Sequence, residues 1–142
     1  MNELHARISR SFRLQGLMAT LGASLEFVDE GEVRIALPFS AHISQQHGYV
    51  HAGAITSVVD SACGYAALTK APAGCEVVSV EFKINLLRPA LGKRFLAIGR
   101  VVNAGRTLTV CAGELHAFAA DNSGYKVVAL MQATMMSVAS TP

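Results

Sequence analysis

Residues 45–68, QQHGYVHAGAITSVVDSACGYAAL, place a polar segment directly before a strongly apolar one. From Ala52 to about Leu68 the residues are nearly all compatible with a helix and include no proline. This pattern predicts one helix of about four to five turns. A helix that is apolar around most of its circumference is normally enclosed by the rest of a soluble protein. We therefore expect the remainder of the chain to surround it.

An acidic residue, Asp60, stands in the middle of this apolar segment. An ionised carboxylate that is buried without partners is unstable, so its presence needs a reason. The residues that are not large and apolar recur at intervals of three and four and therefore share one face of the helix, here called the small-residue stripe: Gly53, Thr56, Ser57, Asp60, Ser61 and Gly64. The stripe is either a packing face, with Asp60 bonded to neighbouring hydroxyls and amides, or a ligand site that presents a carboxylate.

The residues before the helix favour a ligand site. The first amides of a helix have no intrahelical acceptor and carry partial positive charge, which suits a developing oxyanion. The preceding loop adds the polar side chains of Gln45, Gln46, His47 and His51. These groups and a carboxylate can together polarise a carbonyl and direct water to it. We expect His51 to bond to the loop backbone rather than to act as a base, and the spacing of His47 does not indicate its role.

The spacing of the candidate groups predicts an assembly. Ala52 and Asp60 are separated by about 12 Å along the helix axis, which is too far for both to act on one carbonyl carbon. If both act in one reaction, they must come from different copies of the chain. We therefore predict an active site at a two-fold dimer interface, with the Ala52 amide from one subunit and Asp60 from the other.

Three segments carry a resemblance to a known family: HGYVHAGA at 47–54, VVDSA at 58–62 and VSVEFKINLLRPA at 78–90. They resemble the hotdog-fold acyl-CoA thioesterases of the PaaI-like, phenylacetate-pathway type, over residues 22–138. The resemblance implies an α+β hotdog fold, in which a long, curved antiparallel sheet wraps around one central helix. It also implies a hydrolase that cleaves an acyl-CoA, or a related acyl thioester, to free acid and thiol.

The resemblance also assigns roles to residues at matching positions. Asp60 matches the catalytic acid, which acts as general base or as nucleophile, and the Ala52 amide matches the group that polarises the thioester carbonyl. Gln45 matches a second carbonyl contact, and Ser79 matches the hydroxyl that holds the attacking water. The usual His-Gly-Gly of the family reads His51-Ala52-Gly53 here.

Substrate contacts are expected from a further set of residues: Gln46, His47, His51, Gly53, Gly64 and Arg88. The phosphates of coenzyme A could bind Arg88 or three other basic residues near strand ends, Lys93, Arg94 and Arg106. No metal or other cofactor is expected, because a thioester is already activated. Two alternatives remain open: a hotdog hydratase or dehydratase acting on enoyl-CoA or hydroxyacyl-CoA, and a non-catalytic acyl-CoA binding module.

Composition predicts a single domain over residues 1–142 that assembles with copies of itself. The 51% hydrophobic and 15% charged residues exclude a disordered chain and suggest extra apolar surface for a homodimer, or a homotetramer built from two dimers. The net charge of +2, with dispersed Lys and Arg, gives no sign of nucleic-acid binding. Three widely spaced cysteines (Cys63, Cys75, Cys111) indicate reduced thiols in a cytoplasmic protein. We expect neither a signal peptide nor a membrane span.

The rest of the chain predicts one more helix and six strands. An amphipathic pattern predicts a helix over residues 3–20, and alternation predicts a hairpin over 23–38 with a turn at 29–31. Four long strands are predicted at 76–88, 92–103, 107–120 and 125–138, separated by turns at 88–89, 103–105 and 121–124. In the first of these, alternation places Ser79 opposite the apolar face formed by Val80, Phe82, Ile84 and Leu86. We therefore expect Ser79 to meet Asp60 across an interface between subunits.

Overall fold

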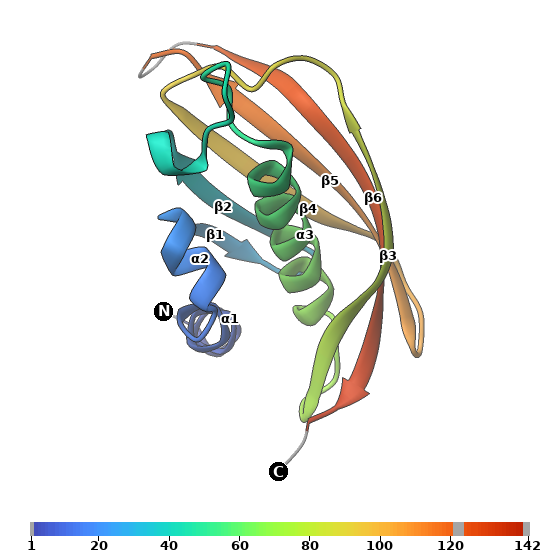
Figure 1. Cartoon of the computed structure of the whole chain (residues 1–142). Coiled ribbons are helices and arrows are strands. Elements are labelled where there is room, and N and C mark those ends of the chain that lie inside the picture. Colours follow the sequence, from blue (N-terminus) through green and yellow to red (C-terminus); the bar gives the residue numbers. More distant parts are fainter. Residues whose placement is uncertain (1, 121–123, 141–142) are drawn as a thin grey trace.

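A curved antiparallel sheet surrounds a central helix in the computed structural model, which describes residues 2–120 and 124–140 (Figure 1). The elements follow one another as α1 (Glu3–Arg13), α2 (Gly16–Leu21), β1 (Ser24–Asp29), β2 (Glu32–Pro38), a 3₁₀ turn (Ala41–Ile43), α3 (Ala52–Leu68), β3 (Cys75–Leu86), β4 (Arg94–Ala104), β5 (Leu108–Phe118) and β6 (Tyr125–Ala139). The predicted α+β hotdog architecture is confirmed.

The central helix α3 has the predicted bounds and lies against the concave face of the sheet (Figure 1). Two glycines that face each other on β4 and β5, Gly99 and Gly113, allow this close approach. A Cβ atom at Gly99 would overlap the backbone of Ala62, and one at Gly113 would lie 2.7 Å from the Sγ of Cys63. The absence of side chains at these two positions therefore lets the helix rest directly on the strands.

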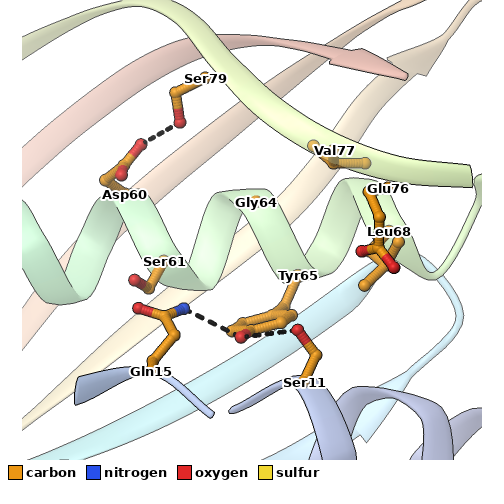
Figure 2. A pocket seen from close by; sticks show the side chains of 10 residues that line it. All are labelled: Ser11, Gln15, Asp60, Ser61, Gly64, Tyr65, Leu68, Glu76, Val77 and Ser79. Carbon is orange, nitrogen blue, oxygen red and sulfur yellow. Dashed lines mark hydrogen bonds between the residues drawn. The ribbon is translucent and has the colours of Figure 1, made fainter. Parts of the chain in front are cut away.

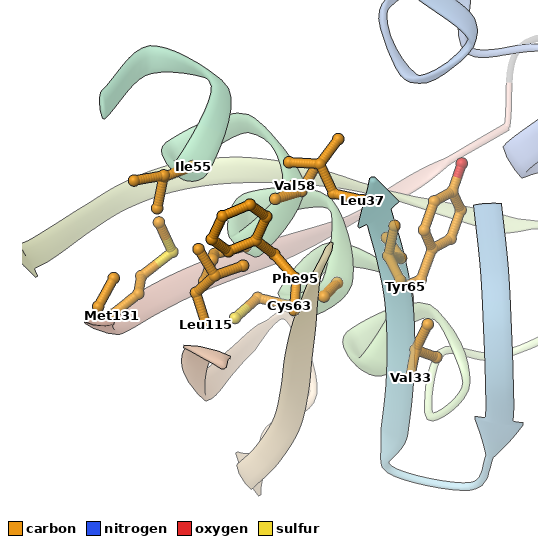
Figure 3. Close-up of a cluster of buried hydrophobic side chains, with 14 of the residues drawn as sticks. Val33, Leu37, Ile55, Val58, Cys63, Tyr65, Phe95, Leu115 and Met131 are labelled. Atoms are coloured by element: carbon orange, nitrogen blue, oxygen red, sulfur yellow. The ribbon is translucent and has the colours of Figure 1, made fainter. Parts of the chain in front are cut away.

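The core fills the space between α3 and the sheet (Figure 3). Val58 and Cys63 of α3 are fully buried against the side chains of the strands. The strands contribute alternate residues to this core, as expected for a sheet with one buried face: Val33, Ile35, Leu37, Phe95, Ala97, Leu115, Met131, Ala133 and Met135.

The prediction of one helix over residues 3–20 is wrong, because the chain forms two helices. Gln15 has an extended backbone (φ −79°, ψ 106°), which ends the helical hydrogen bonding between α1 and α2. Gly22 then ends α2 in the left-handed region at φ 75°, where glycine is favoured. The guanidinium of Arg7 fastens α1 to the end of α3 by donating hydrogen bonds to the carbonyls of Leu68, Ala71, Pro72 and Cys75.

The predicted hairpin and the four long strands are confirmed, with ends that differ by a few residues. The strand order, β1-β2-β4-β5-β6-β3, places β3 at the outer edge beside β6, although β4 follows β3 in the sequence. Of the predicted turn at 121–124, residues 121–123 lie outside the described residues. No helix within 2–120 and 124–140 is long and apolar enough to cross a membrane.

Candidate active site

Asp60 is paired with a hydroxyl from the neighbouring edge strand. The Oγ of Ser79 on β3 donates a hydrogen bond of 2.7 Å to Oδ1 of Asp60 and also lies 3.3 Å from the Sδ of Met135 (Figure 2). Both groups belong to the same chain. The prediction that Ser79 meets Asp60 across a subunit interface is therefore wrong.

The reason is an extra residue in β3. The pairing of β3 with β6 shifts between Ser79 and Glu81, so Val80 stands outside the regular register. Ser79 lies opposite Met135 and Phe82 lies opposite Ala133, and both of these β6 residues face the core. Because a bulge interrupts the two-residue alternation, Ser79 and Phe82 share the inner face of the sheet.

The small-residue stripe is the side of α3 that the sheet leaves uncovered. Among the residues of α3, only Ala52 and the six residues of the stripe are not buried. The hydroxyls of Thr56 and Ser57 donate to the carbonyls of Ala52 and Gly53, one turn earlier, rather than to Asp60. The carboxylate thus remains partly exposed, with Ser79 as its hydrogen-bond donor, and this arrangement favours a ligand site over a packing face.

A cavity of about 260 Å³ opens beside Asp60 (Figure 2). Residues from α1, the α1–α2 junction, α3 and β3 line it: Ser11, Gln15, Asp60, Ser61, Gly64, Tyr65, Leu68, Glu76, Val77 and Ser79. We call it the Asp60 cavity. Of the residues predicted to bind substrate, it contains Gly64.

The N-terminus of α3 is capped so that one amide stays available. The Nδ1 of His51 accepts a hydrogen bond of 2.7 Å from the amide of Gly53, and its carbonyl accepts from the amides of Ala54 and Ile55. His51 therefore has the backbone-bonding role that the sequence predicts. A Cβ atom at Gly53 would lie 3.0 Å from that Nδ1, which explains why glycine suits this position. No described residue accepts a hydrogen bond from the Ala52 amide.

A second cavity, of about 510 Å³, lies at this end of the helix. Its lining includes most of the predicted loop residues: Gln45, Gln46, Tyr49, Val50, His51, Ala52, Ile55, Leu86, Arg88, Pro89 and Ala90. We call it the Ala52 cavity. The Oε1 of Gln45 accepts hydrogen bonds from the amides of His47, at 2.5 Å, and Tyr49, at 3.2 Å. This fixes the side chain, and no described residue accepts a hydrogen bond from its Nε2.

The remaining predicted residues lie elsewhere. His47 and Gly53 are exposed beside the Ala52 cavity but do not line it. Of the four basic residues considered for phosphate binding, Arg88 lines this cavity, and Arg94 instead lies over the ring of Phe118 at 4.0 Å. The Ala52 and Asp60 cavities share no lining residue. A single subunit therefore does not bring the Ala52 amide and the Asp60 carboxylate into one cavity.

Four polar cavity residues were not foreseen from the sequence: Ser11, Gln15, Tyr65 and Glu76. Tyr65 carries the only usable signal, because a buried tyrosine hydroxyl usually needs a hydrogen-bond partner. Its hydroxyl contacts Ser11 Oγ at 3.1 Å and accepts from Gln15 Nε2 at 2.9 Å. These partners are about fifty residues away in sequence, so no local pattern could reveal them.

Comparison with known proteins gives one family match. The profile of the thioesterase superfamily matches residues 47–119, about half of the chain. A candidate esterase from Halobacterium salinarum is 34% identical over 101 residues, which cover 67% of this chain. The aligned part covers 66% of that relative, just under two thirds of its length.

Solved structures also resemble the chain. A thioesterase family protein from Silicibacter pomeroyi is 40% identical with a TM-score of 0.92, and the match covers 96% of this chain and 99% of that one. The PaaI protein from the phenylacetic acid degradation operon of E. coli has the same fold at 22% identity, with a TM-score of 0.85 and 97% and 95% of the two chains covered.

Proposed function

Because the chain belongs to the thioesterase superfamily, we propose that it hydrolyses an acyl-CoA, or a related acyl thioester, to a free acid and a thiol. The observation that carries this proposal is the Asp60–Ser79 pair in an open cavity. A carboxylate with a hydroxyl at 2.7 Å can hold a water molecule and accept its proton.

The proposed reaction uses groups from two subunits. The Ala52 amide of one subunit, with Gln45 Nε2, donates to the carbonyl oxygen of the thioester and stabilises the negative charge that develops there. Asp60 of the other subunit takes a proton from water as the water oxygen attacks the carbonyl carbon. The C–S bond then breaks, and the leaving thiolate takes up a proton. Alternatively, Asp60 attacks directly, the thiolate leaves, and water hydrolyses the resulting anhydride.

The free edge of the sheet supports a homodimer. As the last strand of the sheet, β3 has no neighbouring strand among the described residues on its outer side. Large apolar side chains along this strand and just beyond it are about half exposed: Val78, Val80, Phe82, Leu86 and Leu87. An exposed apolar edge strand favours pairing with another strand. Pairing two β3 strands here in antiparallel fashion would bring the part that carries Ser79 in one subunit toward Leu86 of the other subunit, which lines the Ala52 cavity. A tetramer would be built from two such dimers.

The hydratase alternative is less well supported. That reaction would need a histidine and an acid around the acyl chain, and none of the described histidines lines the Asp60 cavity. Thiol release from a panel of acyl-CoAs, with aryl and linear acyl groups, would test the hydrolase directly, and an enoyl-CoA assay would detect hydration.

Asp60→Asn tests the central residue. The substitution keeps the size of the side chain and its bond with Ser79 but removes the base, so kcat should fall by about a hundredfold or more while acyl-CoA binding persists. Asp29→Asn, a matched change at the far end of β1, should leave turnover unchanged. Equal turnover by Asp60→Asn and the native protein would reject this mechanism. A native protein that binds acyl-CoA without releasing thiol would be a binding module.

A further inference from the structure

We propose that the Asp60 cavity selects acyl groups whose far end carries a neutral hydrogen-bond acceptor, such as a ketone or a hydroxyl, and that Gln15 and Tyr65 recognise this group. This inference rests on the proposed function and assigns a substrate class to its acyl pocket. Gln15 and Tyr65 line the side of the cavity that faces away from the reacting groups (Figure 2).

Asp60 and Ser79 lie at one side of the cavity, and Ser11, Gln15 and Tyr65 gather at another side, next to α1 and α2 (Figure 2). Tyr65 is five residues beyond Asp60 on α3, about 7–8 Å along the helix axis. With the thioester carbon beside Asp60, the far end of an acyl group of medium length reaches the Tyr65 side.

Tyr65 and Ser11 each carry one hydroxyl hydrogen, and the bond between them uses only one of the two. Gln15 donates one of its two Nε2 hydrogens to Tyr65 and keeps the other. No described residue accepts from the remaining hydroxyl hydrogen or from the remaining amide hydrogen. A ligand oxygen with two lone pairs can accept both.

Tyr65 is 6% exposed, and its ring packs against Phe12 with a centroid distance of 6.0 Å. The hydroxyl is therefore held in place before any ligand enters. Polar groups that are fixed at the side of a small cavity discriminate strongly against a ligand that leaves them unpaired.

The residues that line the Asp60 cavity include two carboxylates, Asp60 and Glu76, and no basic side chain. Arg7, which is close in sequence to Ser11, is engaged with four backbone carbonyls at the end of α3. Arg10 lines a neighbouring cavity and not this one. An acyl group that ends in a carboxylate would therefore meet two like charges, and no residue that lines the Asp60 cavity supplies a counter-ion. The favoured group is thus polar but not anionic.

Three thioesters with the same seven-carbon chain test the inference: heptanoyl-CoA, 6-oxoheptanoyl-CoA and pimeloyl-CoA. We expect kcat/KM of the native protein to be about tenfold higher for the 6-oxo substrate than for heptanoyl-CoA, the size of one well-placed hydrogen bond. Pimeloyl-CoA, which ends in a carboxylate, should be the poorest of the three.

Gln15→Leu and Tyr65→Phe should each reduce this preference to about threefold or less, with retained melting temperatures showing that they fold. Matched changes outside the cavity, Gln132→Leu and Tyr125→Phe on β6, should keep the native preference. Equal turnover of heptanoyl and 6-oxoheptanoyl substrates, or an unchanged preference in both cavity variants, would overturn the inference alone. Failure to release thiol from any acyl-CoA would overturn the proposed function and the inference together.

Discussion

Ser79 reaches Asp60 because β3 contains one residue more than its partner strand at Val80. A regular strand would turn the hydroxyl to the outer face and leave the carboxylate without its donor. The same extra residue keeps Phe82 and Ile84 on the inner side, opposite Ala133 and Met131. The bulge thus allows a mostly apolar strand to contribute a polar side chain to the site. Bulges are common beside active sites.

The three cysteines, all free thiols, differ in their surroundings. Burial raises the pKa of Cys63 far above the usual range, and nearby Cys111 and Asp60 raise it further. Burial also raises the pKa of Cys111 to about 11. Because only the thiolate is nucleophilic, both groups are protonated and unreactive at neutral pH. Cys75 is partly exposed at the start of β3.

We therefore predict that a disulfide reagent at pH about 8 modifies one thiol rapidly in the folded protein and all three after unfolding. Titration with a chromogenic aryl disulfide would measure this. Cys75→Ser should abolish the rapid phase. Rapid modification of two or three thiols in native protein would contradict the burial of Cys63 and Cys111.

At the scale of elements, most of the fold could be predicted because its signals are local. The limits of α3 follow from the polar loop before it and from its unbroken apolar composition, and the long strands follow from alternation. The break between α1 and α2 lacks such a signal, since the apolar pattern continues through Gln15. The bulge at Val80 also has no signal in the sequence, because polar and apolar residues still alternate there.

The contact between α3 and the sheet depends on Gly99 and Gly113. Because a Cβ atom at Gly99 would overlap the backbone of Ala62 rather than the end of a flexible side chain, the helix or the strand must move to admit it. Overpacking of this kind typically destabilises a protein by about 1–3 kcal/mol.

Gly99→Ala should therefore lower the melting temperature by about 3–10 °C. Calorimetry or circular dichroism would measure the shift. Gly16→Ala is the matched control, because no atom lies within 4 Å of the added Cβ and alanine favours the helix more than glycine does. An unchanged melting temperature for Gly99→Ala would show that α3 rests less closely on β4 than described.

At the scale of the whole molecule, the candidate site consists of two halves. Their residue types could be predicted from the sequence: the capped N-terminus of α3 with Gln45, and the carboxylate within the small-residue stripe. The far side of the Asp60 cavity could not, because Ser11 and Gln15 come from the N-terminal helices and meet Tyr65 only after folding. The separation of the two cavities supports a site completed by a second subunit.

This arrangement predicts that two inactive variants regain activity when their subunits form mixed dimers. Ala52→Pro removes the candidate oxyanion amide and should cost about a hundredfold or more in kcat. It should leave α3 intact, because proline suits the first position of a helix and His51 already has an extended backbone (φ −61°, ψ 139°). Asp60→Asn removes the carboxylate, which belongs to the other half of the site.

Mixed dimers of the two variants contain one complete site, formed by Ala52 of the Asp60→Asn subunit and Asp60 of the Ala52→Pro subunit. After unfolding and refolding in equal amounts, half of the dimers are mixed and each has one of two sites intact. The mixture should therefore regain about a quarter of the native thiol-release rate. Refolding each variant alone provides the control. If the mixture stays as inactive as its components while heterodimers are detected by native mass spectrometry, each subunit must contain its whole site, because only a site shared between subunits can be rebuilt by exchange.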